Sequence, residues 1–301
     1  MPHFRNLVFL SFCLCWLNSS CQQITVSSGK IDNYPNFTSK NVEPRDVMVW
    51  LPENYDGKKK FAVIYMHDGQ MLFDSTTTWN KQEWKVDENL TALAKDNSLK
   101  QCIVVGIKNN GNKRFKEYFP EKAINYLTED FKTEFIKTEL ESNALADKYL
   151  LFLTQELKPF IDKKYKTHSN QANTFIAGSS MGGLISMYAI CEYPEIYVGA
   201  ACLSTHWVGS VRQKNEFLPA AFMQYLDEKL PNPANHTLYF DFGTKTLDSL
   251  YEPLQLKADV IIRKKGYTDK NLMSKKFEGA DHSENAWSSR LDIPFRFLLK
   301  K

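Results

Sequence analysis

The chain has 301 residues, of which 43% are hydrophobic and 24% are charged, and its formal net charge is +3 at pH 7. A chain of this length can bury a large core, either as one α/β domain or as two smaller domains. The composition and the near balance of charge give no sign of a nucleic-acid-binding stripe or a disordered acidic tail. Composition therefore names no macromolecular partner, and we expect no nucleic acid to bind.

The first 21 residues have the pattern of an export signal. A basic start at Arg5 precedes an apolar run over residues 7–17, and small polar residues follow up to Cys21. The run is shorter than a membrane-spanning helix requires, which favours a cleaved signal over an anchor. The end "NSSC" resembles a bacterial lipobox and predicts a lipid on Cys21, although Asn18 stands where an apolar residue is usual. We expect an exported lipoprotein, periplasmic or tethered to the outer membrane by that lipid alone, with ordinary secretion as the alternative.

The other cysteines outside this segment are Cys102, Cys191 and Cys202, and all three lie inside apolar runs. An odd number of cysteines in apolar surroundings predicts buried thiols rather than a disulfide framework. No CxxC pair or histidine-rich spacing indicates zinc, so we predict no metal site.

Eight apolar runs rich in β-branched residues predict strands. They cover residues 24–31, 45–52, 61–68, 101–109, 173–179, 197–204, 236–243 and 271–280. Amphipathic patterns predict helices over residues 145–163, 181–193, 216–229 and 283–299. Because strands and helices alternate, we predict an α/β fold with a mostly parallel central sheet, helices on both faces and an antiparallel edge.

No linker of proline, glycine or serine divides the chain after the signal, so residues 22–301 are expected to form one domain. A charged insertion at residues 120–145 interrupts the alternation of strands and helices. Ligands of open α/β sheets bind at the carboxyl ends of the strands. This insertion is therefore expected either to cover such a site or to form a solvated helix.

The segment "NTFIAGSSMGGLISMYAI" places a GxSxG motif between a predicted strand and a predicted helix. That setting is typical of a nucleophile elbow, a strained turn that lifts a serine hydroxyl above the sheet. Gly178 and Gly182 leave room for the turn, so the motif selects Ser180 rather than Ser179 as the nucleophile. A flexible turn with a helix cap is the alternative.

A serine nucleophile needs a histidine base that an acidic side chain orients. In this order of elements the base follows the last strand, which selects His282 in "FEGADHSENAW". His67 and His206 also end predicted strands, but both precede the expected position. The alternative for His282 is a polar residue in the loop before a helix.

The acid is expected in the loop that follows the strand at residues 236–243. Asp241, Asp248 and Glu252 are the candidates there. Asp241 falls within the strand, whereas Asp248 follows the turn at Gly243 and can project toward the site. We therefore predict Asp248, for which helix capping is the alternative role.

Acyl transfer also requires N–H donors for the developing oxyanion. One donor is expected from the backbone of Met181, which begins a helix with a favourable dipole. The second is expected from Gln70, in the loop after the strand at residues 61–68, where Gly69 allows the backbone to turn.

With these residues in place, the chain resembles the putative-esterase group of α/β-hydrolases, which includes enterochelin esterases, feruloyl esterase domains, S-formylglutathione hydrolase and mycolyltransferases. The resemblance extends over nearly all of the mature chain. It rests on "YMHDGQMLFD", "WKVDENL", "IVVGIKNNGNKRFKEY", "IAGSSMGGLISMY", "YFDFGTKTLD" and "GADHSENAW". It implies the α/β-hydrolase fold, a triad of Ser180, Asp248 and His282, an oxyanion hole at Gln70 and Met181, and no cofactor.

We accordingly expect a serine esterase that forms an acyl-enzyme on Ser180 and acts on acylated carbohydrates or siderophore esters. Trp84 and Arg114 are candidates for lining the substrate pocket, with aromatic packing as an equal explanation of Trp84. An acyltransferase or peptidase with the same triad is one alternative, because triad chemistry is shared. A catalytically silent binding lipoprotein is the other.

Overall fold

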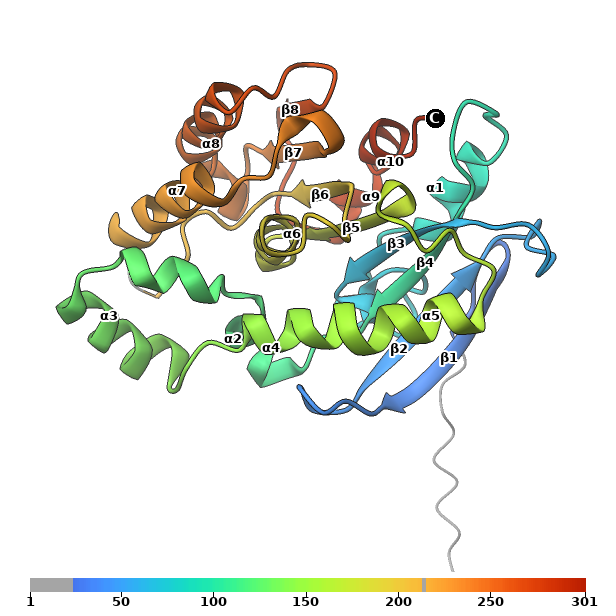
Figure 1. Cartoon of the computed structure of the whole chain (residues 1–301), viewed down its shortest axis with the longest axis horizontal. Helices are drawn as coiled ribbons and strands as arrows, with labels where there is room; N and C mark the ends of the chain where they lie inside the picture. The colour runs from blue at the N-terminus through green and yellow to red at the C-terminus, as the bar shows by residue number, and fades with distance from the viewer. Residues whose placement is uncertain (1–23, 213–214) are drawn as a thin grey trace, which may run out of the picture.

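A mixed sheet of eight strands organises the computed structural model, which describes residues 24–212 and 215–301 (Figure 1). The strands lie in the order β1-β2-β4-β3-β5-β6-β7-β8. Their bounds are β1 Lys30–Phe37, β2 Arg45–Leu51, β3 Ala62–His67, β4 Cys102–Ile107, β5 Thr174–Ser179, β6 Gly199–Leu203, β7 Thr237–Gly243 and β8 Leu272–Phe277. Strands β3 to β8 are parallel, and β1 and β2 add an antiparallel edge. The predicted α/β-hydrolase-type sheet is thereby confirmed.

Ten α-helices cover the sheet within the described residues. They are α1 Val86–Leu93, α2 Arg114–Tyr118, α3 Glu129–Phe135, α4 Ala146–Leu151, α5 Lys158–Lys164, α6 Met181–Glu192, α7 Phe217–Lys229, α8 Glu252–Lys264, α9 Glu284–Ser288 and α10 Asp292–Leu298. A π-helical stretch, Phe152–Leu157, joins α4 to α5, so one continuous rod spans the helix predicted at residues 145–163.

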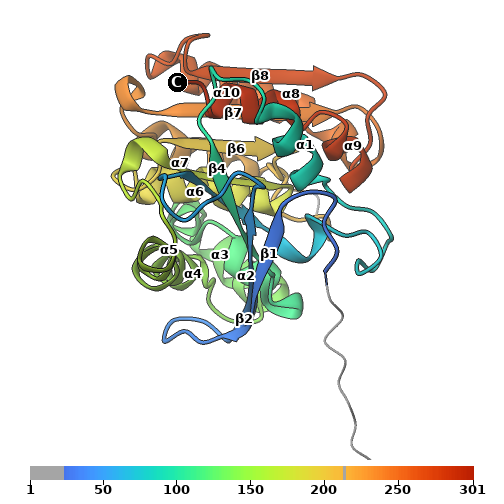
Figure 2. The same ribbon diagram turned by 90° about the vertical axis from the view of Figure 1, so that its right-hand side faces the viewer.

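Successive side chains of the inner strands face two separate cores, because side chains alternate across a strand. On β2, Val47 and Val49 belong to the core beneath α4 to α8, whereas Met48 and Trp50 belong to the core beneath α1 and α10. Helices therefore lie on both faces, as predicted. Figure 2 shows the sheet from β8 at one end to β1 and β2 at the other.

The helix predicted over residues 283–299 is two helices, α9 and α10, with a break between them. Pro294 explains the break. A proline inside a helix removes one N–H and clashes with the carbonyl four residues earlier, here that of Arg290. Continuous helix through this junction is therefore excluded, although the amphipathic pattern runs across it.

The first strand begins at Lys30, so the strand predicted at residues 24–31 was placed too early. The backbone before it bonds to carboxylates instead of to a neighbouring strand. Thr25 N–H donates to Asp74 Oδ2 at 2.8 Å, and Ser27 N–H donates to Asp87 Oδ2 at 2.7 Å. The apolar pattern correctly predicted that Ile24 and Val26 pack against the core, where both are partly buried. It did not distinguish an irregular extended segment from a strand.

The charged insertion at residues 120–145 packs against α7. The Phe131 and Phe217 rings have centroids 4.7 Å apart, and the Tyr126 hydroxyl donates to Glu228 Oε2 at 2.6 Å. Lys122 forms an ion pair with Glu192 at the end of α6. The insertion is therefore part of the helical layer on that face and is more than a solvated helix.

Cys102, Cys191 and Cys202 are all free and buried, as predicted. In the part of the chain that the structure describes, no helix is both long and apolar enough to cross a membrane. Cys21 and the rest of the predicted signal lie outside the described residues.

Candidate active site

Ser180 occupies the turn between β5 and α6 with φ of 57° and ψ of −122°. A residue other than glycine rarely adopts a positive φ, and such strain costs about 1–3 kcal/mol. The close approach of strand and helix requires a glycine: a Cβ on Gly178 would lie 2.8 Å from the carbonyl carbon of Gly182. The conformation is that of the predicted elbow.

The loop after β6 holds this elbow by its backbone. Ser180 N–H donates to the Leu203 carbonyl at 2.9 Å, and His206 N–H donates to the Ser180 carbonyl at 3.2 Å. Gly183 also lies close to this loop, because a Cβ there would stand 3.1 Å from the Leu203 oxygen. The backbone of the nucleophile is therefore fixed on both sides by one neighbouring loop.

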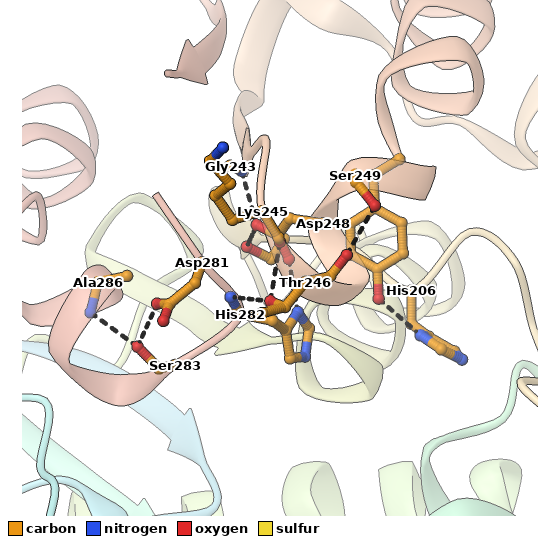
Figure 3. A network of polar contacts seen from close by, with 12 residues as sticks. His206, Gly243, Lys245, Thr246, Asp248, Ser249, Asp281, His282, Ser283 and Ala286 are labelled. Atoms are coloured by element: carbon orange, nitrogen blue, oxygen red, sulfur yellow. Dashed lines mark hydrogen bonds and ion pairs between the residues drawn. The ribbon is translucent and has the colours of Figure 1, made fainter. Parts of the chain in front are cut away.

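His282 and Asp248 face each other, with 2.5 Å between Nδ1 and Oδ1 (Figure 3). Asp248 is fully buried, and its Oδ2 accepts hydrogen bonds from the Gly243 N–H and the Ser204 hydroxyl, both at 2.6 Å. Gly243 is itself tightly enclosed, since a Cβ would stand 2.2 Å from the Ala280 oxygen. Hydrogen bonds therefore fix both carboxylate oxygens of Asp248, and Oδ1 faces the imidazole of His282.

The other two acid candidates have different partners. Asp241 binds Arg290 through both carboxylate oxygens, at 3.0 and 3.1 Å. Glu252 pairs with Lys276 at the surface. Of the three candidates, the structure therefore brings only Asp248 to His282.

Ser204 joins the acid to a second buried ion pair. Its hydroxyl, which donates to Asp248, also accepts from Trp287 Nε1 at 2.9 Å and from Arg290 at 3.1 Å. The Trp287 ring packs edge-on against His282, with centroids 4.9 Å apart. One hydroxyl therefore links the acid, the ring beside the base and the Asp241–Arg290 pair.

The two predicted oxyanion donors each lie in the first turn of a helix. Gln70 lies in the short 3-10 helix Gly69–Met71 after β3, and Met181 begins α6. The first N–H groups of a helix have no intrahelical acceptor, so these amides are suited to bind an anion. The Asn109 N–H donates to Gln70 Oε1 at 3.2 Å and so ties this loop to the loop after β4.

Asp68 and Arg114 form a two-pronged ion pair beside the elbow, with both N–O distances at 2.7 Å. Asn109 adds a bond to Asp68 Oδ1 at 2.7 Å. Burial alone would raise the pKa of Asp68, but Arg114 and Asn109 lower it below its usual value. A Cβ on Gly182 would lie 3.3 Å from Asp68 Oδ2, so this pair directly adjoins the GxSxG turn.

His67 and His206 are buried at the ends of β3 and β6. Burial lowers the pKa of each to about 3, so both imidazoles are neutral at physiological pH. His67 Nδ1 bonds the Tyr149 hydroxyl at 2.8 Å, and His206 Nδ1 bonds the Tyr251 hydroxyl at 2.8 Å. Such weak bases do not compete with His282 for the role of general base.

Trp84 is only 2% exposed and packs against Trp287, with ring centroids 5.4 Å apart. It lies behind the ring that supports His282, which favours aromatic packing over the predicted role in the substrate pocket. The Arg114 side chain retains 28% exposure, so it keeps a face toward solvent.

Residues that the sequence did not single out complete the site: Asp68, Asn109, Ser204, Tyr251, Trp287 and Arg290. Trp287 stands five positions after His282 and Asp68 within "HDGQ", so both lay inside segments that carried the family resemblance. Asn109 also lay in such a segment, "IVVGIKNNGNKRFKEY", whereas Ser204, Tyr251 and Arg290 have no local signal. Over residues 24–212 and 215–301, no cluster of His, Cys, Asp or Glu is arranged to hold a metal ion.

Comparisons of the sequence and of the structure with known proteins agree with the family and the fold that the sequence predicts. A sequence model of the family described as "Putative esterase" matches residues 40–298. The Bacillus subtilis (strain 168) protein YbbA, which is uncharacterised, is 23% identical over 79% of this chain and 86% of its own. An IroE-like serine hydrolase from Shewanella oneidensis matches with a TM-score of 0.66 and 18% identity, over 90% of this chain and 80% of that chain. A ferulic acid esterase from Anaeromyces mucronatus matches with a TM-score of 0.62 and 21% identity, over 95% and 97%.

Proposed function

Because the chain belongs to the putative-esterase family, a group of carboxylic ester hydrolases, we propose that it cleaves esters through an acyl-enzyme on Ser180. The observations that carry this proposal are the His282–Asp248 pair and the strained elbow geometry of Ser180, both at the carboxyl ends of the parallel strands. The nucleophile Ser180, the acid Asp248 and the base His282 follow one another in the chain order usual for this fold. The structural likeness to the solved esterases, at low sequence identity, supports the fold alone. The proposed chemistry therefore rests on Ser180, Asp248 and His282.

The geometry supports the following mechanism. Asp248 holds Nδ1 of His282, which leaves Nε2 to remove the Ser180 proton as the serine attacks an ester carbonyl. The N–H groups of Gln70 and Met181 stabilise the tetrahedral oxyanion. His282 then protonates the leaving alcohol, and a water activated by the same imidazole releases the acid and restores Ser180.

We propose acylated carbohydrates or siderophore esters as the substrates of an exported protein, lipidated at Cys21. A cavity of about 230 Å³ beside the oxyanion loop suits a small group with polar and apolar parts, because Gln70 and Lys108 line it together with Phe73. Arg114 is a candidate contact for a polar or anionic part of the substrate. Hydrolysis of aryl esters, feruloyl and acetyl sugars and siderophore lactones, compared side by side, tests this choice.

Labelling with a fluorophosphonate tests the reaction class. We expect the wild-type protein to be labelled and Ser180→Ala to remain unlabelled. Ser179→Ala, one position earlier in the same turn, is the matched control and should still react. A wild-type protein that is not labelled, or labelling that survives Ser180→Ala, would sink the serine-esterase proposal.

A further inference from the structure

Tyr251 stands between the imidazoles of His206 and His282. Its hydroxyl lies 2.8 Å from His206 Nδ1, a bond drawn as a dashed line at His206 in Figure 3. Its ring packs edge-on against His282 with centroids 5.9 Å apart. The Ser180 side chain also interacts with this hydroxyl, and the interaction opposes the increase in the Tyr251 pKa that burial causes. Tyr251 has no exposed surface, so bulk water does not compete for these contacts.

His206 is fixed relative to the nucleophile by more than its side chain. Its N–H donates to the Ser180 carbonyl at 3.2 Å, and the Ser180 N–H donates to Leu203, the last residue of β6 before the loop that holds His206. The imidazole, the tyrosine hydroxyl and the serine therefore form one chain of contacts on a shared backbone support. Because His206 is neutral, one of its ring nitrogens donates a hydrogen bond and the other accepts one.

The proton order in this chain follows from the chemistry at Ser180. A tyrosine hydroxyl has one proton, so Tyr251 donates either to His206 or to Ser180. The Ser180 proton must pass to His282 during attack, which leaves Ser180 Oγ free to accept the Tyr251 proton as a hydrogen bond. Tyr251 then accepts from Nδ1–H of His206. Consecutive hydrogen bonds of this kind polarise one another in a buried site.

We propose that Tyr251 is a further catalytic residue that donates a hydrogen bond to Ser180 Oγ, and that His206 is a positioning residue that acts through Tyr251. This inference rests on the esterase function proposed above. Tyr251 keeps its proton throughout, and only the bonds of acyl transfer form and break. Its donor serves the attacking oxygen, whereas the Gln70 and Met181 amides serve the oxygen of the substrate.

Tyr251→Phe removes the hydroxyl and keeps the ring against His282. We expect kcat for a p-nitrophenyl ester and the rate of fluorophosphonate labelling both to fall about 10- to 100-fold, with KM within twofold of wild type. Tyr267→Phe is the matched control, because it also removes a buried hydroxyl, which bonds the Pro231 carbonyl at 3.1 Å. This bond lies at the amino ends of β7 and β8, at the opposite end of the strands from Ser180. A Tyr251→Phe variant within twofold of wild type, or one that changes KM alone, would overturn the proposal.

The role of His206 is tested by a double-mutant cycle. We expect His206→Leu to lower kcat, and His206→Asn to recover part of the loss because its amide can donate from near the Nδ1 position. In the Tyr251→Phe background, His206→Leu should cause little further loss, since both changes break one chain. Fully additive losses would show that His206 does not act through Tyr251.

A spectroscopic test needs no ester. Nitrogen-15 NMR of histidine-labelled protein at neutral pH should show His206 protonated at Nδ1, with the signal assigned by its loss in His206→Leu. A proton on Nε2 instead would mean that Tyr251 donates to His206, which overturns the proposed direction. Failure of the wild-type protein to react with fluorophosphonate would count against the esterase function and leave this tautomer result standing.

Discussion

At the scale of single residues, the candidate site depends on buried side chains whose orientation is fixed by hydrogen bonds. Asp248 is buried and accepts hydrogen bonds from Gly243 and Ser204 on the oxygen that does not face His282. A buried carboxylate whose second oxygen is already bonded can present only the first to the base. The orientation of His282 is therefore set by Asp248 together with Gly243 and Ser204.

Asp248→Asn tests this assignment. Loss of the carboxylate charge leaves the imidazolium without its partner and allows the wrong tautomer, so turnover of a p-nitrophenyl ester should fall roughly 10³- to 10⁴-fold. Glu252→Gln is the control, because Glu252 pairs with Lys276 at the surface. If Glu252→Gln abolishes turnover while Asp248→Asn stays near wild type, the assignment of the acid is wrong.

Gly178→Ala tests the close approach at the elbow. The new Cβ would lie within 3.0 Å of three backbone atoms of Gly182, and backbone cannot yield as a side chain can. We expect the free energy of unfolding to fall by about 1–3 kcal/mol, measured by urea denaturation. Gly182→Ala meets its nearest atom at 3.3 Å and should cost less. Equal losses in the two variants would contradict this explanation.

At the scale of elements, the backbone before β1 is held by carboxylates. The N–H groups of Ser27 and Ser28 donate to Asp87 Oδ2 at 2.7 and 3.3 Å, at the start of α1. Burial raises the pKa of Asp87 to about 7, with Glu88 adding to the increase. The segment before β1 is thus bonded to the Asp87 carboxyl, whose negative charge is disfavoured in the folded state.

This attachment predicts a pH-dependent stability. The unfolded pKa of an aspartate is about 3.9, so the folded protein binds the extra proton and loses stability as pH rises from about 4 through about 7. Asp87→Asn keeps an acceptor oxygen and removes the charge. In urea denaturation the variant should exceed wild type by about 1–3 kcal/mol at pH 8 and match it near pH 4.

The control for this prediction is Glu53→Gln. Glu53 accepts a bond from the Ser28 hydroxyl at the same segment but is exposed, so its substitution should not alter the slope of stability against pH. A wild-type protein whose stability rises between pH 5 and pH 8, relative to Asp87→Asn, would contradict the expected sign.

At the scale of the whole molecule, the site lies where the parallel strands end, along the row of their carboxyl termini. Its residues come from the segments after β3, β4, β5, β6, β7 and β8, which are parallel and so bring their carboxyl ends together. This is the edge at which open α/β sheets bind ligands. Ile24 also lines the cavity beside Gln70, so the segment before β1 lies close to the loop after β3.

Cys21→Ser tests the proposed tether. With the lipid lost, the protein should move from the membrane pellet to the soluble fraction of a bacterial host, with esterase activity per molecule unchanged. Cys15→Ser, within the same predicted signal, is the matched control and should remain in the pellet. A wild-type protein found wholly in the soluble fraction would contradict lipidation.

The sequence alone determined what depends on neighbours along the chain. The strands from β2 onward, the elbow at Ser180 and the candidates His282 and Asp248 could be predicted, because turn geometry and burial period are local properties. The break before α10 was also a local signal, carried by Pro294, but the amphipathic pattern hid it.

Only the tertiary structure decided which polar groups meet. The partners of Ser204 and His206 lie 44 and 45 residues away, at Asp248 and Tyr251, and the partner of Asp68 lies 46 residues away at Arg114. No spacing rule relates such residues, because hydrogen bonds between loops depend on how the strands beneath them are ordered. The chemistry proposed for Ser180 follows from a motif, and the support around it follows from the sheet.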